Sequence, residues 1–160
     1  MATISYDFLT YVLAHFFQRQ DSPQPSDSRS TVGLILLGNT GVGKSFLANI
    51  LLGKEAFAHE CQGSSVTHVA EHELLRLSER SYVVFNVPGL IEYDQEIIER
   101  NKMEIQKAFD QCPNSIIASV FGAGVGGRIV DQDIVAFNAL KDAYQFQPDS
   151  LIFIINNIPK

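Results

Sequence analysis

One eight-residue segment constrains the fold of this chain more than any other feature. It reads Gly38-Asn39-Thr40-Gly41-Val42-Gly43-Lys44-Ser45 and fits the pattern G-x-x-x-x-G-K-[ST] at every constrained position. Such glycines let the backbone curl so that successive N–H groups point at one anion, and a following helix directs its positive end to the same point. The pattern predicts that Lys44 reaches the β- and γ-phosphates of a nucleotide and that Ser45 gives its hydroxyl to Mg²⁺.

The residues on either side of this segment have the strand–loop–helix order that phosphate binding requires. Thr31 to Leu37 is a nearly continuous apolar run, which is typical of a buried parallel strand. After the loop, apolar residues recur at helical spacing until Gly53, which suits a helix C-cap. Phe46, directly after the motif, is counted with the phosphate-binding residues.

Length and composition indicate one soluble α/β domain. The chain has 160 residues, of which 46% are hydrophobic and 19% charged, which suits a sheet covered on both faces. Its formal net charge of −6 argues against a broad surface for nucleic acid. Cys61 and Cys112 make no disulfide framework, and reduced thiols in a cytoplasmic protein are the simplest account of them.

The sequence predicts three regions: an apolar helix over residues 1–19, a flexible linker over 20–30 and the phosphate-binding domain over 31–160. The apolar run Phe8–Phe17 is too short to span a bilayer, and it lacks the basic flank and cleavage pattern of a secretory signal. A helix packed on the domain is favoured over a contact with a partner or a membrane surface, which stays an alternative. Gln20–Ser30 holds two prolines and four serines, which is typical of a linker.

A long loop is predicted from Lys54 to Thr67, because this stretch lacks sustained periodicity. His59, Cys61, His68 and His72 in or beside it raise a zinc hypothesis. Their spacing matches no compact zinc module, so polar loop residues are the favoured interpretation.

The rest of the chain predicts a doubly covered sheet. Two antiparallel strands are expected at Glu71–Leu77 and Ser81–Phe85, followed by a helix from about Asp94. Further elements are a buried strand at Ser115–Phe121, a helix with the apolar stripe Val130, Ile134, Phe137, Leu140 and Tyr144, and a strand at Leu151–Ile155. The order β-α-β-β-α-β-α-β predicts a three-layer α/β fold with sheet order 2-3-1-4-5, strand 2 antiparallel, and the nucleotide at the carboxyl ends of the strands.

Four stretches resemble the septin-like P-loop GTPases, and most closely their immunity-associated nucleotide-binding (GIMAP-type) group. They are the P-loop, the switch I-like Ser65-Val66-Thr67, the switch II-like Val87-Pro88-Gly89-Leu90, and Gly127–Asp133, which is similar to the box between the third and fourth guanine motifs. The resemblance implies binding of GTP or GDP with Mg²⁺. It further implies that Thr67 joins Ser45 on the metal, that Gly89 touches the γ-phosphate and that Gly38–Ser45 wraps the β-phosphate.

Three positions depart from the GTPase pattern. Asn86 stands where an aspartate is expected, so Mg²⁺ binding should weaken. Leu90 stands where Ras-like proteins have a water-orienting glutamine, and the resemblance then implies slow hydrolysis that depends on a partner or on self-association. Arg128 is a candidate arginine finger by residue type alone, and the sequence assigns no catalytic residue.

The base-recognition segment is the third departure. In Asn156-Asn157-Ile158-Pro159, proline replaces the guanine-binding aspartate, and Asn156 and Asn157 remain as candidate base contacts. A preference for GTP over ATP therefore comes from the resemblance. Because the chain stops at Lys160, we expect a domain without its sixth strand and last helices, and correspondingly a homo-oligomer or a protein partner.

Two alternatives stay open. Gly122–Gly127 satisfies the dinucleotide pattern G-x-G-x-x-G, but without an acidic residue ending a second strand, and a flexible loop near the nucleotide is favoured. The function is either a GTP-binding switch with slow hydrolysis or a degenerate domain that serves as an interaction module. Asn86 and Pro159 favour the module, and the intact P-loop with Thr67 favours the switch.

Overall fold

The computed structural model describes residues 32–58, 69–77, 80–89 and 95–158, and within them it forms one five-stranded sheet of order β2-β3-β1-β4-β5. β1 is parallel to both β3 and β4, β4 is parallel to β5, and β2 is antiparallel to β3. This confirms the predicted strand order and the antiparallel second strand. The strands are β1 (Val32–Leu37), β2 (Glu71–Leu77), β3 (Arg80–Asn86), β4 (Ser115–Gly122) and β5 (Leu151–Asn156).

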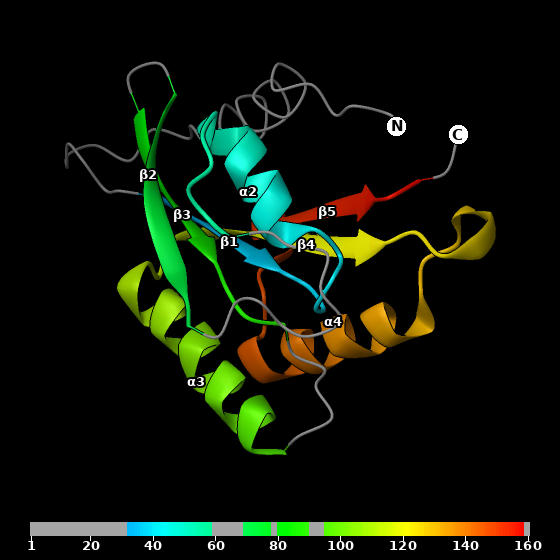
Figure 1. Ribbon diagram of the computed structural model, residues 1–160. Helices are drawn as coiled ribbons and strands as arrows, with labels where there is room; N and C mark the ends of the chain where they lie inside the picture. The colour runs from blue at the N-terminus through cyan, green and yellow to red at the C-terminus, as the bar shows by residue number, and fades with distance from the viewer. Residues whose placement is uncertain (1–31, 59–68, 78–79, 90–94, 159–160) are drawn as a thin grey trace.

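Helices cover both faces of this sheet, which makes the predicted three layers. Figure 1 shows α2 on one face and α3 with α4 on the other. The described helices are α2 (Lys44–Leu52), α3 (Gln95–Gln111), α4 (Asp131–Tyr144) and two short 3₁₀ turns, η1 (Val125–Gly127) and η2 (Pro148–Ser150). α2 ends at Gly53, whose left-handed backbone lets its N–H donate to the carbonyls of Asn49 and Ile50, as predicted for a C-cap.

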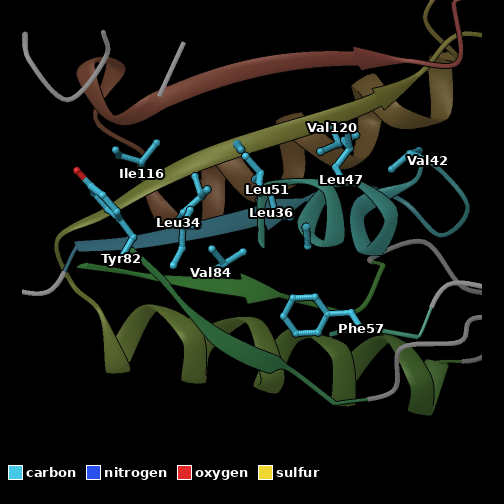
Figure 2. Packing of buried hydrophobic residues seen from close by; sticks show 13 residues of the cluster. Leu34, Leu36, Val42, Leu47, Leu51, Phe57, Tyr82, Val84, Ile116 and Val120 are labelled. Carbon is cyan, nitrogen blue, oxygen red and sulfur yellow. The ribbon is translucent and has the colours of Figure 1, made fainter. Parts of the chain in front are cut away.

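The central strand β1 is buried on both faces, which explains its unbroken apolar sequence. Leu34 and Leu36 pack toward α2, whereas Ile35 and Leu37 pack toward α3 and α4. Figure 2 shows the α2 side of this core, where Leu47 and the strand residues meet. Burying each such side chain contributes about 1.5–3 kcal/mol, which fixes β1 and therefore the position of the loop that follows it.

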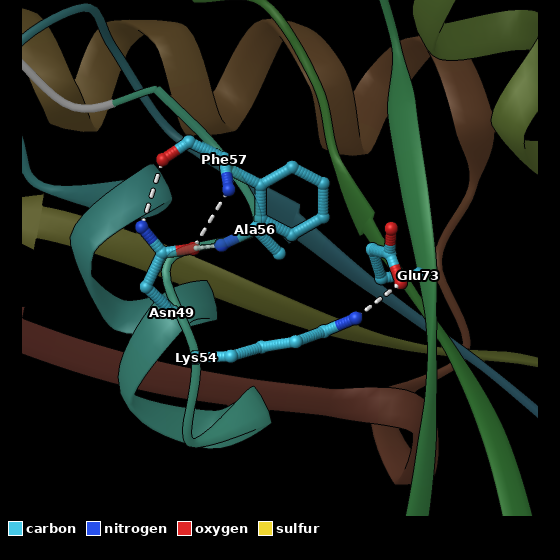
Figure 3. Close-up of polar contacts among 5 residues, drawn as sticks. All are labelled: Asn49, Lys54, Ala56, Phe57 and Glu73. Atoms are coloured by element: carbon cyan, nitrogen blue, oxygen red, sulfur yellow. Dashed lines mark hydrogen bonds and ion pairs between the residues drawn. The ribbon is translucent and has the colours of Figure 1, made fainter.

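The first residues after α2 are attached to that helix through one buried side chain, Asn49 (Figure 3). Its Nδ2 donates to the carbonyl of Phe57 at 2.8 Å, and its Oδ1 accepts from the backbone N–H groups of Ala56 at 2.9 Å and Phe57 at 2.8 Å. The Phe57 ring is buried in the α2-side core. The predicted loop thus begins with a short anchored segment, and its part from residue 59 to Thr67 lies outside the described residues.

The predicted buried stripe of α4 is partly wrong. Ile134 is 42% exposed and Val130 39% exposed, whereas the fully buried positions of the helix are Asp133, Ala136 and Leu140. In this orientation of α4 the Asp133 carboxylate faces the interior, where it accepts two hydrogen bonds. The neighbouring Ile134 consequently faces outward.

The rival dinucleotide interpretation also fails on geometry. β4 ends at Gly122, but α4 begins only at Asp131, with the exposed turn η1 between them. In a dinucleotide fold the glycines themselves open the helix. Residues 122–127 are therefore a loop at the carboxyl ends of the strands, where the P-loop also lies.

Several predictions fall on residues that the structure does not describe. These are the helix over 1–19, the linker over 20–30, Thr67, Leu90, Pro159 and three of the four zinc candidates, His59, Cys61 and His68. The fourth candidate, His72, packs its ring against Phe85 at a centroid distance of 5.5 Å, with the two ring planes tilted by 38°. Within the described ranges, no helix has the length and apolarity to cross a membrane, and no group of three or more metal-binding side chains occurs.

Candidate functional site

The predicted phosphate loop lies between the end of β1 and the start of α2, and Lys44 folds back across it. The Lys44 Nζ donates to the backbone carbonyls of Gly38 and Asn39, each at 2.9 Å, and the side chain is only 7% exposed. A buried ammonium is costly unless it is hydrogen-bonded, and here the loop carbonyls supply those bonds. They hold the cation beside the loop, within reach of an anion seated in it.

The N-terminus of α2 is suited to an anion. Gly43 occupies the cap position with φ of +93°, and among the described residues no side chain caps the helix and no acidic residue lies in its first turn. The first N–H groups of a helix have no intrahelical acceptor and carry partial positive charge. A phosphate at this position would accept hydrogen bonds from such N–H groups and would balance their partial positive charge.

Asn156 closes the loop from the end of β5. Its Nδ2 donates to the carbonyl of Val42 at 2.9 Å, and a Cβ added to Gly43 would lie 2.3 Å from the same nitrogen. Only glycine tolerates both this close approach and the positive φ. Asn157, the other predicted base contact, is exposed and has a φ of +60°, and Phe46 in the first turn of α2 is 45% exposed.

The predicted metal corner brings Ser45 to Asn86 at the end of β3. Asn86 is fully buried, and its Nδ2 donates to the Ser45 Oγ at 2.9 Å. An aspartate there would accept the serine proton, whereas the amide occupies a lone pair of the oxygen that would face the metal. The donor set at this corner therefore fits Mg²⁺ only weakly, because it has a hydroxyl but no carboxylate from β3.

Gly89, the predicted γ-phosphate contact, lies directly against the phosphate loop. A Cβ at this position would lie 2.4 Å from the Thr40 Oγ1 and 2.5 Å from the Thr40 backbone nitrogen. Asn101 of α3, 1% exposed, holds Gly89 there by donating from Nδ2 to its carbonyl at 2.6 Å. The start of the predicted switch segment is thus fixed between α3 and the loop.

Two side chains of the site escaped sequence reasoning, Asn101 and Asp133. Asp133 accepts from the Asn39 Nδ2 at 2.8 Å through Oδ1 and from the backbone N–H of Gly122 at 2.7 Å through Oδ2. A signal for Asp133 exists, because it shares the helical line of Ala136 and Leu140 at spacings of three and seven residues, and a charge on a buried line needs a partner. Asn101 lies three residues before the buried Glu104 and carries no comparable signal.

Together, the sheet order with an antiparallel second strand and the glycine-rich loop between β1 and α2 define a P-loop NTPase fold of the Ras-like G-domain type. The sequence pattern of the AIG1 family matches residues 32–155. The chain belongs to the AIG1 family, in agreement with the GIMAP-type resemblance of its motifs.

Individual relatives agree with this assignment. GTPase IMAP family member 8 of Rattus norvegicus is 31% identical over 84 residues, which covers 52% of this chain and 12% of the relative. Immune-associated nucleotide-binding protein 5 of Arabidopsis thaliana is 30% identical over 121 residues, which covers 76% of this chain and 38% of the relative. The chain therefore spans well under two thirds of the length of either relative.

Among solved structures, the complex of Era with MgGDPNP and a segment of 16S ribosomal RNA is similar in fold. Its TM-score is 0.50 at 12% sequence identity, and the match covers 79% of this chain and 52% of that chain. At this identity the likeness concerns the fold alone.

Proposed function

We propose that this chain binds a guanine nucleotide through Gly38–Ser45 and works as a switch with slow hydrolysis that depends on self-association or on a partner. The observation that carries the proposal is the loop geometry: a buried Lys44 beside an uncapped helix N-terminus. The positive charge of Lys44 and the partial positive charge of a helix N-terminus without a side-chain cap favour a polyphosphate over any neutral ligand.

The choice of guanine rests on family membership. The chain belongs to the AIG1 family, and the two named relatives are described as a GTPase and as a nucleotide-binding protein. Asn156 emerges at the end of β5 beside the loop, where a base-recognition segment would have to start, but its amide group donates to the Val42 carbonyl and therefore adds no preference for guanine. Asn157 follows it and is exposed for contact with a base.

Mg²⁺ would be held by Ser45, with Asn86 as the neighbour that orients the hydroxyl, and Thr67 stays a proposed second ligand. The ion would supply positive charge beside the β- and γ-phosphates. Because Asn86 brings no negative charge, we expect nucleotide to bind with a weaker dependence on Mg²⁺ than in a protein with aspartate at this position.

Slow hydrolysis follows from missing groups. A switch of this type needs a residue that orients the attacking water and a cation that neutralises developing charge. The described residues contribute Lys44 as the buried cation of the loop, and Arg128 is exposed, so that it is free to act on another molecule but is not fixed at this site. A partner or a second copy of the chain would supply what is missing.

The alternative is a degenerate domain that binds nucleotide statically, or not at all, and serves as an interaction module. The bond from Asn86 to Ser45 favours this alternative, because the amide occupies a lone pair of the hydroxyl oxygen that would face Mg²⁺ and brings no negative charge. The two functions differ in turnover, since a static module holds one nucleotide without converting it.

The deciding experiment identifies any nucleotide retained on purification and then measures the affinities for GTP, GDP and ATP with and without Mg²⁺. We expect preferential binding of GTP and GDP, and a loss of at least about 100-fold in Lys44→Ala, because both the charge and its reach to the phosphates disappear. Lys54→Ala is the matched control, since Lys54 is an exposed lysine that pairs with Glu73 at 2.8 Å away from the loop. Unchanged binding in Lys44→Ala would refute the phosphate site, and absent turnover at high protein concentration would leave the static module.

A further inference from the structure

Asp133 is a buried carboxylate for which the proposed nucleotide chemistry has no use. It is 7% exposed, and in the described part of the chain no cation pairs with it. An unpaired buried charge is costly, and here only two charge-assisted hydrogen bonds offset that cost. Both bonds lead to the candidate site.

The first bond reaches the phosphate loop. The Asp133 Oδ1 accepts from the Asn39 Nδ2 at 2.8 Å, and the backbone carbonyl of Asn39 in turn accepts from the Lys44 Nζ at 2.9 Å. The carboxylate therefore fixes the side chain of the loop residue whose backbone holds the functional lysine. If Lys44 moved toward a phosphate, its hydrogen bond to the Asn39 carbonyl would lengthen or break.

The second bond reaches the glycine-rich loop, which we define as residues 122–130. The Asp133 Oδ2 accepts from the N–H of Gly122 at 2.7 Å, at the point where β4 ends and this loop begins. Farther along, Val125 is fully exposed, and a Cβ on Gly126 would meet nothing within 4 Å. The loop is therefore held at its base, by Gly122 and by the Ala123 N–H, which donates to the Asn156 carbonyl at 2.8 Å, and has room to change only at its tip around Val125 and Gly126.

We propose that Asp133 is a positioning residue that couples the phosphate-binding loop to the glycine-rich loop, so that nucleotide binding at the first loop changes the backbone dynamics of residues 122–130. This inference rests on the proposed function and adds its regulation. One carboxylate joins three segments: the first turn of α4, the end of β4 that lies 11 positions before it, and the loop after β1 that lies 94 positions before it. Because both oxygens belong to one rigid carboxylate, a shift of the Asn39 side chain that moves Oδ1 also moves Oδ2 relative to the Gly122 N–H.

Asp133→Asn tests the coupling with almost no change in shape. An amide keeps one acceptor oxygen, which can stay on the Gly122 N–H, and its NH₂ group then faces the Asn39 amide, so the charge-assisted bond to the phosphate loop is replaced at best by a weaker neutral one. Asp131→Asn is the matched control, because Asp131 lies in the same first turn of α4 and is exposed. It removes the same charge from the same helix end, so any effect of the helix dipole is common to both variants.

Asn39→Ala is the second variant, which keeps the carboxylate and its bond to Gly122 but cuts the connection to the loop. We expect Asp133→Asn to weaken GDP binding about tenfold and Asp131→Asn to leave it within about twofold. We expect GDP to slow amide hydrogen exchange at Gly122 and across residues 122–130 in the wild type, and to lose this effect in Asn39→Ala. A purely structural role would lower the unfolding temperature without removing the dependence of exchange on GDP.

The outcomes separate the two proposals. Wild-type protein that binds no nucleotide would overturn the proposed function. GDP binding in which Asp133→Asn equals Asp131→Asn, or exchange in Asn39→Ala that still responds fully to GDP, overturns the coupling alone. If Asp133→Asn does not fold, the exchange measurement on Asn39→Ala decides.

Discussion

The two ends of the candidate site are built in different ways. At the phosphate end, Lys44 is buried against loop carbonyls and Gly89 touches Thr40 so closely that no side chain fits. At the base end, Asn157 and Ile158 are exposed, and only Asn156 is held by a hydrogen bond to the loop. The phosphate end is defined by backbone geometry that a short motif encodes, whereas the base end depends on a few side chains after a strand.

This difference teaches which properties of the site tolerate change. A single replacement of a glycine here brings a clash, as at Gly89, or a side chain at a positive φ, as at Gly41, and loss of a backbone N–H removes a donor. Exposed side chains at a strand end can be exchanged at little cost in stability, so base preference is free to vary while phosphate binding is retained. The proline at position 159, where guanine-specific proteins have aspartate, is an example of such variation at the base end.

The largest effect on stability is expected from Gly89→Ala, which adds a methyl group at the phosphate end of the site. The added Cβ would lie 2.5 Å from the Thr40 backbone nitrogen, so the strand end or the loop must move. We expect the free energy of unfolding to fall by about 2 kcal/mol, as for other overpacked positions. Urea unfolding would measure it against Gly124→Ala, where the new Cβ meets the Val130 side chain at 3.3 Å. Equal losses in the two variants would mean that Gly89 does not press on the loop.

Asn156→Ala tests to which end of the site Asn156 belongs. Its hydrogen bond in the structure goes to the Val42 carbonyl, which is part of the phosphate loop. We expect the variant to weaken GDP and ADP by the same factor, about fivefold, because about 1 kcal/mol of support for the loop is lost. Calorimetric titration of both nucleotides measures this, with the exposed Asn114 changed to alanine as a control. A loss confined to GDP would move Asn156 to the base end.

Asn86→Asp sharpens the comparison at the metal corner. A carboxylate at the Ser45 hydroxyl would accept its proton and add the negative charge that Mg²⁺ prefers. We expect the affinity of the nucleotide complex for Mg²⁺ to rise about threefold, since a charged acceptor adds somewhat less than 1 kcal/mol beyond a neutral one here. Titration with Mg²⁺ measures it, and Asn114→Asp adds the same charge on an exposed residue. An unchanged or lower affinity would show that Asn86 is not beside the metal.

Much of the fold follows from local sequence. The apolar run before the P-loop predicts β1 to within one residue. The bounds of β3 and β4 are predicted nearly as well, because buried strands have continuous apolar sequences. The orientation of α4 could not be predicted in this way. In this orientation Asp133 bonds to Asn39, 94 positions away, and a contact over that separation leaves no pattern in the local sequence.

The same limit holds for the site. The motif predicts the loop, because glycines and a lysine at fixed spacing allow only one backbone geometry around a phosphate. It does not predict Asn101, whose role depends on where α3 crosses Gly89, a contact set by packing of the whole layer. Which residues support a motif depends on the tertiary packing around it, so a pattern search along the sequence does not find them.

The smallest effect concerns α3, one turn beyond Asn101. Glu104 accepts from the Lys107 Nζ at 2.6 Å and from the Ala70 backbone N–H at 3.0 Å, and the Lys107 bond is the main reason why the pKa of Glu104 lies below its usual 4.5. A lowered pKa in the folded state means that the ionised form stabilises the fold at pH values above the unfolded pKa. This contribution is lost as the pH falls through the folded pKa.

We therefore expect Glu104→Gln to lower the free energy of unfolding at pH 7 by about 0.5 kcal/mol, a small value because Lys107 is 55% exposed and solvent screens the pair. The difference from the wild type should shrink as the pH falls below the unfolded pKa of about 4.5 and through the lower folded pKa of Glu104. Thermal unfolding from pH 7 to pH 3 measures it, with Glu99→Gln as the control from the exposed pair Glu99–Lys102. A difference that persists unchanged at pH 3 would mean that Glu104 acts through packing rather than charge, and α3 would then hold Gly89 independently of pH.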